Sequence, residues 1–430
     1  MFLARKKELT LLEENYLKPT SDLLFLFGRK RVGKTALLNE YTTEKSTIYI
    51  SCIEMIPKLF FNNLHESLVS FFNLKTSTPS NNLDEILVFI NEQKILKKLI
   101  IVIDDFQNLL KIDKNALYTL TSFWNKHLQK KNIQFILSSS VYSSIQKDVK
   151  IYEKASAVIL LKPLDIGVIK DMIPEVSKTD VMYIYASYGT NLNYLKNYDI
   201  KKDFILNVKD TFLSSNSPIF EEGLNIIRQD LSDVLTYSSI LHAIAMGNNK
   251  IGDIANFLGF KSTYLTRYIQ KLVDLMIVSK SIPINDDKFK SKFGRYFIED
   301  NYLKFWFCYV YPNISALRKN DLYGVVSHIR RDFSKRLVSD AYKQYVLDLI
   351  SSEPEKFFGY SPIKIGSWWN NKDHEIDIIG FDNKEITFID CRWRKKDSIE
   401  SSYKILKDKS NYLNTPLSKK YIIFAKNYTS

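Results

Sequence analysis

The chain has 430 residues, 45% of them hydrophobic, which predicts several domains with buried cores; no apolar run approaches the roughly 20 residues that cross a bilayer. The first residues lack the apolar segment of a signal peptide, so we expect a cytoplasmic protein without a membrane partner. Three widely separated cysteines exclude a disulfide framework and a C-x-x-C metal pair, and the net charge of +13 fits either a polyanionic partner or a lysine-rich solvated surface.

A phosphate-binding loop follows the first apolar run, Leu23 to Phe27. Its members are Gly28, Arg29, Lys30, Arg31, Val32, Gly33, Lys34 and Thr35. The glycines let backbone N–H groups turn toward phosphates, Lys34 reaches the β and γ phosphates, and the Thr35 hydroxyl sits on Mg²⁺. The helix that begins near Gly33 adds its positive dipole end. The motif therefore predicts a site for a nucleoside triphosphate and Mg²⁺.

Short apolar runs alternate with helical stretches as far as Leu164, and this alternation predicts a parallel sheet with crossover helices. The runs are Leu23 to Phe27, Thr47 to Ser51, Leu99 to Ile103, Ile133 to Leu137 and Val158 to Leu161. Residues 1–164 are thus expected to form a P-loop core. Ligands of such sheets bind at the carboxyl ends of the strands.

Two carboxylates, Asp104 and Asp105, follow the third apolar run. In a phosphoryl-transfer site the first would serve the metal and the second would polarise the attacking water. After the next strand, Ser140 would place a hydroxyl near the γ phosphate, although a plain serine-rich turn is an open alternative. The predicted groups are catalytic Lys34, Asp105 and Ser140, and metal-binding Thr35 and Asp104.

The whole pattern predicts an α/β multidomain protein whose P-loop sheet is followed by further segments. These are a helical lid at 165–210, a winged helix at 211–285, a connecting aromatic and helical segment at 286–331, and a second α/β region at 332–430. Thr211 to Pro218 has the composition of a linker.

Residues 251–275 predict a helix, a tight turn and a second helix. Apolar side chains at helical spacing should pack inward, namely Leu265, Ile269, Leu272 and Leu275. The side chains left outward are Thr263, Tyr264, Thr266, Arg267, Gln270 and Lys271. They suit a helix in the major groove of double-stranded DNA, with Val278 to Ile284 as the wing. A winged helix used only for protein packing is the alternative.

Residues 375–393 predict a β-hairpin near the end of the chain. Asp377 and Asp390 would meet across it, Arg392 shares the face of Asp390, and Asp340 is a further candidate carboxylate. Paired carboxylates of this kind hold the metal of restriction-type nucleases. Arginine stabilises charge but cannot act through deprotonation, so an active nuclease, a silent relic and a binding module all stay open.

These motifs together resemble the archaeal-type P-loop ATPases of the signal-transducing STAND class. The matching segments are Phe2 to Leu9, the two phosphate-site motifs, Leu161 to Leu164, Gly189 to Leu195, Arg295 to Asn301 and Phe305 to Phe307. The resemblance implies an ATPase core, a winged helix and a C-terminal restriction-endonuclease-like domain, with ATP as the nucleotide. It also implies that Arg5 lies near the adenine.

The chain departs from the family pattern at several positions. Asp105 stands where the family has glutamate, so the water-orienting carboxylate is one methylene short and hydrolysis should be slow. Ser139 replaces a glycine, Arg392 replaces a lysine, and a Gly-Arg pair before Lys162 is missing. Since the sequence has no arginine at 32–227, an arginine finger would come from a later domain or another subunit, or be replaced by lysine.

We therefore expect a slow Mg²⁺-dependent ATPase that acts as a nucleotide-controlled switch and binds DNA through its winged helix. One alternative is an ATP-gated DNA endonuclease that uses the C-terminal carboxylates. Another is a scaffold, ordered by nucleotide, that binds a protein partner or forms a homo-oligomer.

Overall fold

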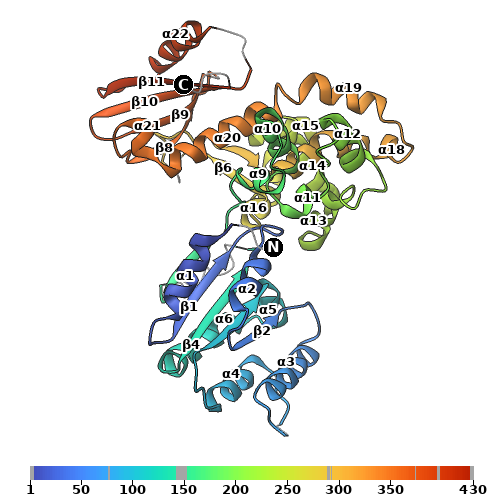
Figure 1. The fold of residues 1–430 in the computed structure, drawn as a ribbon, viewed down its shortest axis with the longest axis vertical. Coiled ribbons are helices and arrows are strands. Elements are labelled where there is room, and N and C mark those ends of the chain that lie inside the picture. Colours follow the sequence, from blue (N-terminus) through green and yellow to red (C-terminus); the bar gives the residue numbers. More distant parts are fainter. Residues whose placement is uncertain are drawn as a thin grey trace. The chain divides into compact units, whose positions relative to one another are not determined.

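The computed structural model describes residues 4–75, 78–141, 153–287, 291, 293–372, 374–394 and 398–426 (Figure 1). Phe2 and Leu3 of the first matching segment lie outside these residues. The chain divides into two compact units, residues 1–164 with 274–276, and residues 165–273 with 277–430. Among the residues described, none of the helices combines the length and apolarity needed to span a bilayer.

The first unit contains a five-stranded sheet in the order β2-β3-β4-β1-β5, with every neighbouring pair parallel. Its strands are β1 Asp22–Phe27, β2 Thr47–Ser51, β3 Leu99–Asp104, β4 Ile133–Ser139 and β5 Ala157–Leu160. The predicted parallel sheet is therefore confirmed. Strand β4 lies between β1, which leads into the phosphate loop, and β3, which ends in Asp104, so three polar segments meet at one edge of the sheet.

Helices cover both faces of this sheet (Figure 1). They are α1 Lys6–Tyr16, α2 Lys34–Thr42, α3 Pro57–Phe71, α4 Leu83–Glu92, α5 Phe106–Ile112 and α6 Ala116–Lys126, with a 3₁₀ turn at Leu128–Lys130. Alternate residues of β1 serve opposite faces, because Leu24 and Leu26 pack with α1 and α2 while Phe25 and Phe27 pack with the other helices. Burial on both faces explains why these strands are continuous apolar runs in the sequence.

The second unit begins with helices that pack around an aromatic core. They are α9 Val168–Met172, α10 Lys178–Tyr188, α11 Leu192–Leu195, α12 Phe204–Val208, a π-helical turn at Lys209–Leu213, α13 Glu222–Asp230, α17 Asn301–Phe305, a second π-helical turn at Trp306–Val310, a 3₁₀ turn at Tyr311–Asn313, α18 Ile314–Leu317, α19 Tyr323–Asp332, α20 Leu337–Ser352 and α21 Pro354–Phe358. Tyr302, Phe305 and Trp306 are fully buried. The segment predicted as a connection is thus central to this core.

The prediction of a linker at 211–218 is wrong at its first residues. Thr211, Phe212 and Leu213 belong to a helical turn and are buried. Phe212 lies 4.6 Å from Phe305 and 5.6 Å from Tyr302 between ring centroids. The serines and proline that follow gave the segment its polar composition, but the aromatic residue is fixed by tertiary packing.

Helices α14 Val234–Ala245, α15 Ile251–Leu258 and α16 Ser262–Asp274 are followed by the antiparallel strands β6 Val278–Ser281 and β7 Arg295–Ile298, in the region where the sequence predicts a winged helix. Strand β7 lies beyond residue 285, the predicted end of the winged helix. Ile284, which follows β6, packs on the C-terminal sheet, because it is buried with Trp368 and Ile376 and its N–H donates to Ser367 O over 2.9 Å. The last residue of the predicted wing therefore contacts the C-terminal sheet.

The C-terminal sheet has the order β11-β10-β9-β8. Its strands are β8 Lys364–Trp369, β9 Glu375–Phe381, β10 Glu385–Arg392 and β11 Ser418–Ala425. The predicted hairpin is confirmed, because β9 and β10 pair antiparallel with Ile378 opposite Ile389. Helix α22, Ile399–Ser410, connects β10 to β11, which are parallel. The region is thus a mixed α/β sheet.

Candidate functional site

The phosphate loop turns tightly between β1 and α2. Gly28 N–H donates to Ser139 O over 3.3 Å, which ties the loop to β4. A Cβ on Gly28 would lie 2.8 Å from Val32 Cγ1 and 3.0 Å from Leu161 O, so only glycine fits there. Gly33, immediately before α2, has φ of 99°, a left-handed conformation that glycine adopts without steric cost.

Lys34, the first residue of α2, directs its ammonium group back over the loop. Its Nζ donates to Gly28 O over 2.9 Å and to Arg29 O over 3.4 Å, and the residue is buried. The ammonium group therefore lies over the loop, where we expect the phosphates of a nucleotide to bind. Phosphate oxygens would make stronger, charge-assisted bonds than these neutral carbonyls.

Thr35 and Asp104 join the loop to the end of β3. The Thr35 hydroxyl donates to Asp104 Oδ2 over 2.7 Å, and the Tyr49 hydroxyl from β2 donates to the same oxygen over 2.8 Å. Burial raises the pKa of Tyr49, and the charge of Asp104 raises it further. Asp104 is thus a buried carboxylate that neutral hydroxyls hold in place.

These oxygens fit a magnesium ion. Mg²⁺ usually takes one or two protein oxygens and completes its octahedron with phosphate oxygens and water. Thr35 Oγ1 and Asp104 Oδ2 supply such a pair beside Lys34, and Asp104 lies at the carboxyl end of its strand. When bound, the ion would neutralise phosphate charge.

Asp105 follows Asp104 in a left-handed conformation, with φ of 54°. Its Oδ1 accepts a hydrogen bond from Gln107 Nε2 over 2.9 Å. Gln107 Oε1 in turn accepts from Ser139 Oγ over 2.9 Å and from Ser140 N over 3.2 Å. One buried amide thus connects the predicted water-orienting carboxylate to the end of β4.

Ser140 lies at the same end of β4 and is fully buried. Within the described residues its hydroxyl has no hydrogen-bond partner, nor has that of Ser138. A buried hydroxyl without a hydrogen bond destabilises the fold unless a ligand binds it. Contact of Ser140 with a nucleotide therefore stays a prediction.

Arg5 contacts the phosphate loop from the N-terminal side. Its Nη2 donates to Val32 O over 3.0 Å, and its Nη1 lies 3.1 Å from Glu8 Oε1. Burial lowers the pKa of Arg5, and the charge of Glu8 opposes this effect. The guanidinium therefore braces the loop backbone, and the predicted contact with adenine stays a prediction.

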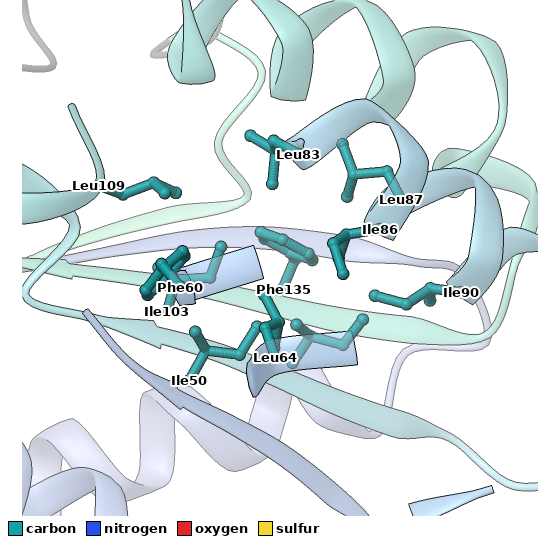
Figure 2. Close-up of a pocket in the computed structure, with 11 residues that line it drawn as sticks. Ile50, Phe60, Leu64, Leu83, Ile86, Leu87, Ile90, Ile103, Leu109 and Phe135 are labelled. Atoms are coloured by element: carbon teal, nitrogen blue, oxygen red, sulfur yellow. The ribbon is translucent and has the colours of Figure 1, made fainter. Parts of the chain in front are cut away.

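An apolar pocket in the same unit is separate from this site. Figure 2 shows its lining side chains converging between the sheet and the helices α3 and α4. They are Ile50, Phe60, Leu64, Leu83, Ile86, Leu87, Ile90, Ile101, Ile103, Leu109 and Phe135. No polar group lines it, so it is a packing gap of the core and not a nucleotide site.

Comparison with known families agrees with this geometry. Residues 2–198 match the family model of an ATPase domain predominantly from Archaea. This stretch of the chain is therefore similar to archaeal-type P-loop ATPase domains. Residues 306–405 match a second family model, of archaeal and bacterial proteins of unknown function. The ATPase domain implies nucleotide binding, and this agrees with the resemblance inferred from the motifs.

Relatives and solved structures extend the likeness. An uncharacterized protein of Methanocaldococcus jannaschii is 27% identical over 98% of this chain and 94% of its own length. An uncharacterized ATP-binding protein of the same organism is 42% identical over 45 residues, 10% of this chain and 76% of its own. The Aeropyrum pernix ORC1 protein in complex with DNA covers 76% of this chain and 95% of its own, with 15% identity and a TM-score of 0.38. A STAND protein with a tetratricopeptide repeat sensor from Pyrococcus horikoshii covers 83% of this chain and 51% of its own, with 13% identity and a TM-score of 0.34.

Beyond the ATPase domain, helix α16 has the two faces that the sequence predicts. Leu265, Ile269, Leu272 and Leu275 are buried. The exposed residues are Thr263, Tyr264, Thr266, Arg267 and Gln270, and Lys271 is half-buried. The Arg267 guanidinium lies over the rings of Tyr264 and Tyr268, at 5.2 and 4.9 Å. The arginine would have to leave this aromatic pair to reach a base.

The C-terminal carboxylates come together only in part. Asp377 precedes Ile378 and Asp390 follows Ile389, its antiparallel partner, and Arg392 forms an ion pair with Asp390. Asp340 does not join them, because α20 directs it to Lys304, at 2.6 Å. Within the described part of the chain, no three histidine, cysteine, aspartate or glutamate side chains converge on a metal position.

Several residues at these sites were missed by the sequence analysis. They are Tyr49, Gln107, Arg295, Lys343 and Glu375. Glu375 stands two residues before Asp377 in the same strand, so the two-residue period of a strand could have predicted that both side chains lie on one face. Lys343 and Arg295 reach Glu375 from distant elements, and no local pattern reveals such contacts.

Proposed function

We propose that this protein is a slow, Mg²⁺-dependent ATPase that works as a nucleotide-controlled switch. The observation that carries the proposal is the 2.7 Å hydrogen bond between Thr35 and Asp104, which brings the phosphate loop and the acidic strand into one site. The ATPase family match over 2–198 supports ATP as the nucleotide.

In this proposal each polar group has one task. Lys34 and the loop N–H groups bind the phosphates, while Thr35 and Asp104 hold Mg²⁺. Asp105 orients the attacking water, and Gln107 fixes the Asp105 carboxylate. Slow turnover is expected because Asp105 is shorter than glutamate and the sequence has no arginine at 32–227.

Calorimetry with ATP and Mg²⁺ tests the binding step. Lys34→Ala should weaken affinity about 10- to 100-fold, because one charge-assisted contact is worth about 1.5–3 kcal/mol. Lys58→Ala removes an exposed lysine from α3 and should change nothing. Absence of any heat from the wild type would refute the proposal.

Hydrolysis is tested separately by phosphate release from the purified monomer. We expect turnover at or below about one per second, the low end for enzymes. A monomer that turns over tens of ATP molecules per second would contradict the switch.

DNA binding through α16 is a second candidate, supported by its polar face with the exposed Arg267 and the half-buried Lys271. Ile284 is buried, so this proposal assigns the contact to α16. Arg267→Ala with Lys271→Ala should weaken binding and reduce its salt slope by up to about 2. Lys404→Ala, an exposed lysine on α22, serves as the control. An unchanged slope would favour the protein-interaction scaffold.

The endonuclease alternative predicts Mg²⁺-dependent loss of supercoiled plasmid that Asp377→Ala abolishes. The geometry of the C-terminal carboxylates argues against it, because Asp377 pairs with Lys343 and Asp390 pairs with Arg392.

A further inference from the structure

Three carboxylates, of Glu375, Asp377 and Asp390, share one face of the β9–β10 hairpin without converging on a single metal position. Glu375 and Asp377 are two residues apart on β9, so they share a face. The Cys391 N–H from β10 donates to Asp377 Oδ2 over 2.9 Å. Burial raises the pKa of Asp390, and the nearby charge of Asp377 raises it further. This is the face on which a metal-dependent nuclease would hold its ion.

Lys343 from α20 already places a positive charge on this face. Its Nζ lies 2.7 Å from Glu375 Oε1 and 3.1 Å from Asp377 Oδ1. Burial opposes the charged form, but the charges of Asp377 and Glu375 outweigh it and raise the pKa of Lys343. The ammonium group is therefore retained at neutral pH and bridges both carboxylates.

Two arginines complete the neutralisation. Arg295 Nη1 lies 2.7 Å from Glu375 Oε2, and its guanidinium stacks 4.6 Å from the Trp369 ring. Arg392 forms an ion pair with Asp390. Each of the three carboxylates thus has a cationic partner. A divalent ion would have to displace Lys343 from the oxygens that face it, so the residues present do not fit a nuclease metal.

The same ion pairs join separate elements of the unit. Arg295 belongs to the wing strand β7, Lys343 belongs to α20, and Glu375 belongs to the C-terminal sheet. Apolar packing of Ile284 and the hydrogen bond from Trp369 Nε1 to Phe293 O, at 2.9 Å, reinforce the junction. Glu375 therefore forms ion pairs with Arg295 of β7 and with Lys343 of α20.

We propose that Lys343 stands in the place of a divalent cation, and that these carboxylates form an ion-pair clasp that holds the wing hairpin and α20 on the C-terminal sheet. The clasp takes no part in cleaving nucleic acid.

Manganese binding by the full chain without nucleotide, followed by electron paramagnetic resonance, tests the occupancy. Wild type and Asp377→Asn should bind Mn²⁺ equally, because the wild type holds none at this face. Lys343→Met keeps the apolar stem but removes the charge, and it should bind one Mn²⁺ more than the wild type. Adding Asp377→Asn to Lys343→Met should abolish that extra ion.

Three results would overturn the proposal. If the wild type binds a manganese ion that the Asp377→Asn variant does not bind, a metal site exists at this face. Plasmid nicking with Mg²⁺ that Asp377→Asn abolishes would make Lys343 the lysine of a working nuclease. A folded Lys343→Met variant that gains no ion would show that the ammonium does not occupy a cation site. If that variant does not fold, the comparison of wild type with Asp377→Asn decides.

The clasp itself is tested by a double-mutant cycle on Arg295 and Glu375, with each residue changed to alanine. The two changes should be coupled about fivefold or more in the unfolding equilibrium constant, because the pair is largely shielded on the arginine side. The matched control is the more exposed pair Lys420 and Glu385, also at 2.7 Å, whose coupling should be about twofold or less. Equal coupling in the two cycles would contradict the clasp.

Discussion

Gln107 holds the Asp105 carboxylate through a 2.9 Å hydrogen bond from Nε2 to Oδ1, while its carbonyl oxygen accepts from the end of β4. The two residues are separated by one position at the start of α5, where Asp105 adopts a left-handed backbone conformation. Within the described residues this bond engages Oδ1, and Oδ2 is the oxygen that we expect to orient water. The side-chain amide of Gln107 thus connects the end of β4 to Asp105.

Removal of this amide should affect chemistry more than binding. Gln107→Ala frees the Asp105 carboxylate, so we expect kcat to fall about tenfold or more with little change in the affinity for ATP. Steady-state hydrolysis together with calorimetry separates the two effects. Gln93→Ala, a glutamine after α4, is the control. Equal losses of affinity and rate would mean that Gln107 only maintains the fold.

Lengthening the water-orienting carboxylate should accelerate hydrolysis. Asp105→Glu restores the methylene that the family pattern contains, so kcat should rise several-fold, and the left-handed backbone adds a modest strain of about 1 kcal/mol. Asp113→Glu at the end of α5 is the matched control. A rate equal to or below that of the wild type would assign the slow turnover to another cause.

Gly28 should tolerate no side chain. A Cβ would approach Val32 Cγ1 to 2.8 Å and the Leu161 carbonyl to 3.0 Å, so Gly28→Ala must shift the phosphate loop and should weaken ATP binding at least tenfold. Gly252→Ala on α15 is the control, because its Cβ meets nothing within 4 Å and should raise stability by up to about 1 kcal/mol. Unchanged ATP affinity in Gly28→Ala, measured by calorimetry, would show that the loop adapts.

Acid should loosen the C-terminal clasp. Burial opposes ionisation of Glu375, but Lys343 and Arg295 outweigh it and lower its pKa from 4.5 to about 2. A carboxylate with a depressed folded-state pKa contributes stability above its unfolded pKa and loses that contribution as pH falls toward the folded value. We therefore expect a loss of stability between pH 4.5 and about 2 that Glu375→Gln does not show. Urea unfolding at several pH values measures it; identical pH profiles would exclude this role for Glu375.

The parallel sheet and phosphate loop were predictable because their signals are local. Strands buried on both faces are continuous apolar runs, and the loop glycines and Lys34 are fixed by spacing along the chain. Asp377 and Asp390 were placed correctly because a hairpin brings its two strands together by a short turn.

The remaining contacts depend on tertiary structure. Asp340 and Lys343 lie one turn apart on α20, yet only Lys343 reaches the hairpin, while Asp340 pairs with Lys304. Helical periodicity does not tell which of two neighbouring faces meets a distant strand. Phe212 was hidden in the same way, because its polar neighbours set the local composition while its ring packs against Tyr302.

The burial of Ile284 bears on how this protein can be divided. A fragment that stops after β7 would lack Trp368 and Ile376, which cover Ile284. The Ile284 side chain would then be exposed to water. A fragment that starts at residue 332 would lack Ile284 and would therefore leave a cavity in the core of the C-terminal sheet. The helices that carry the DNA-binding candidate and the C-terminal sheet should therefore be expressed together, and we expect them to unfold together.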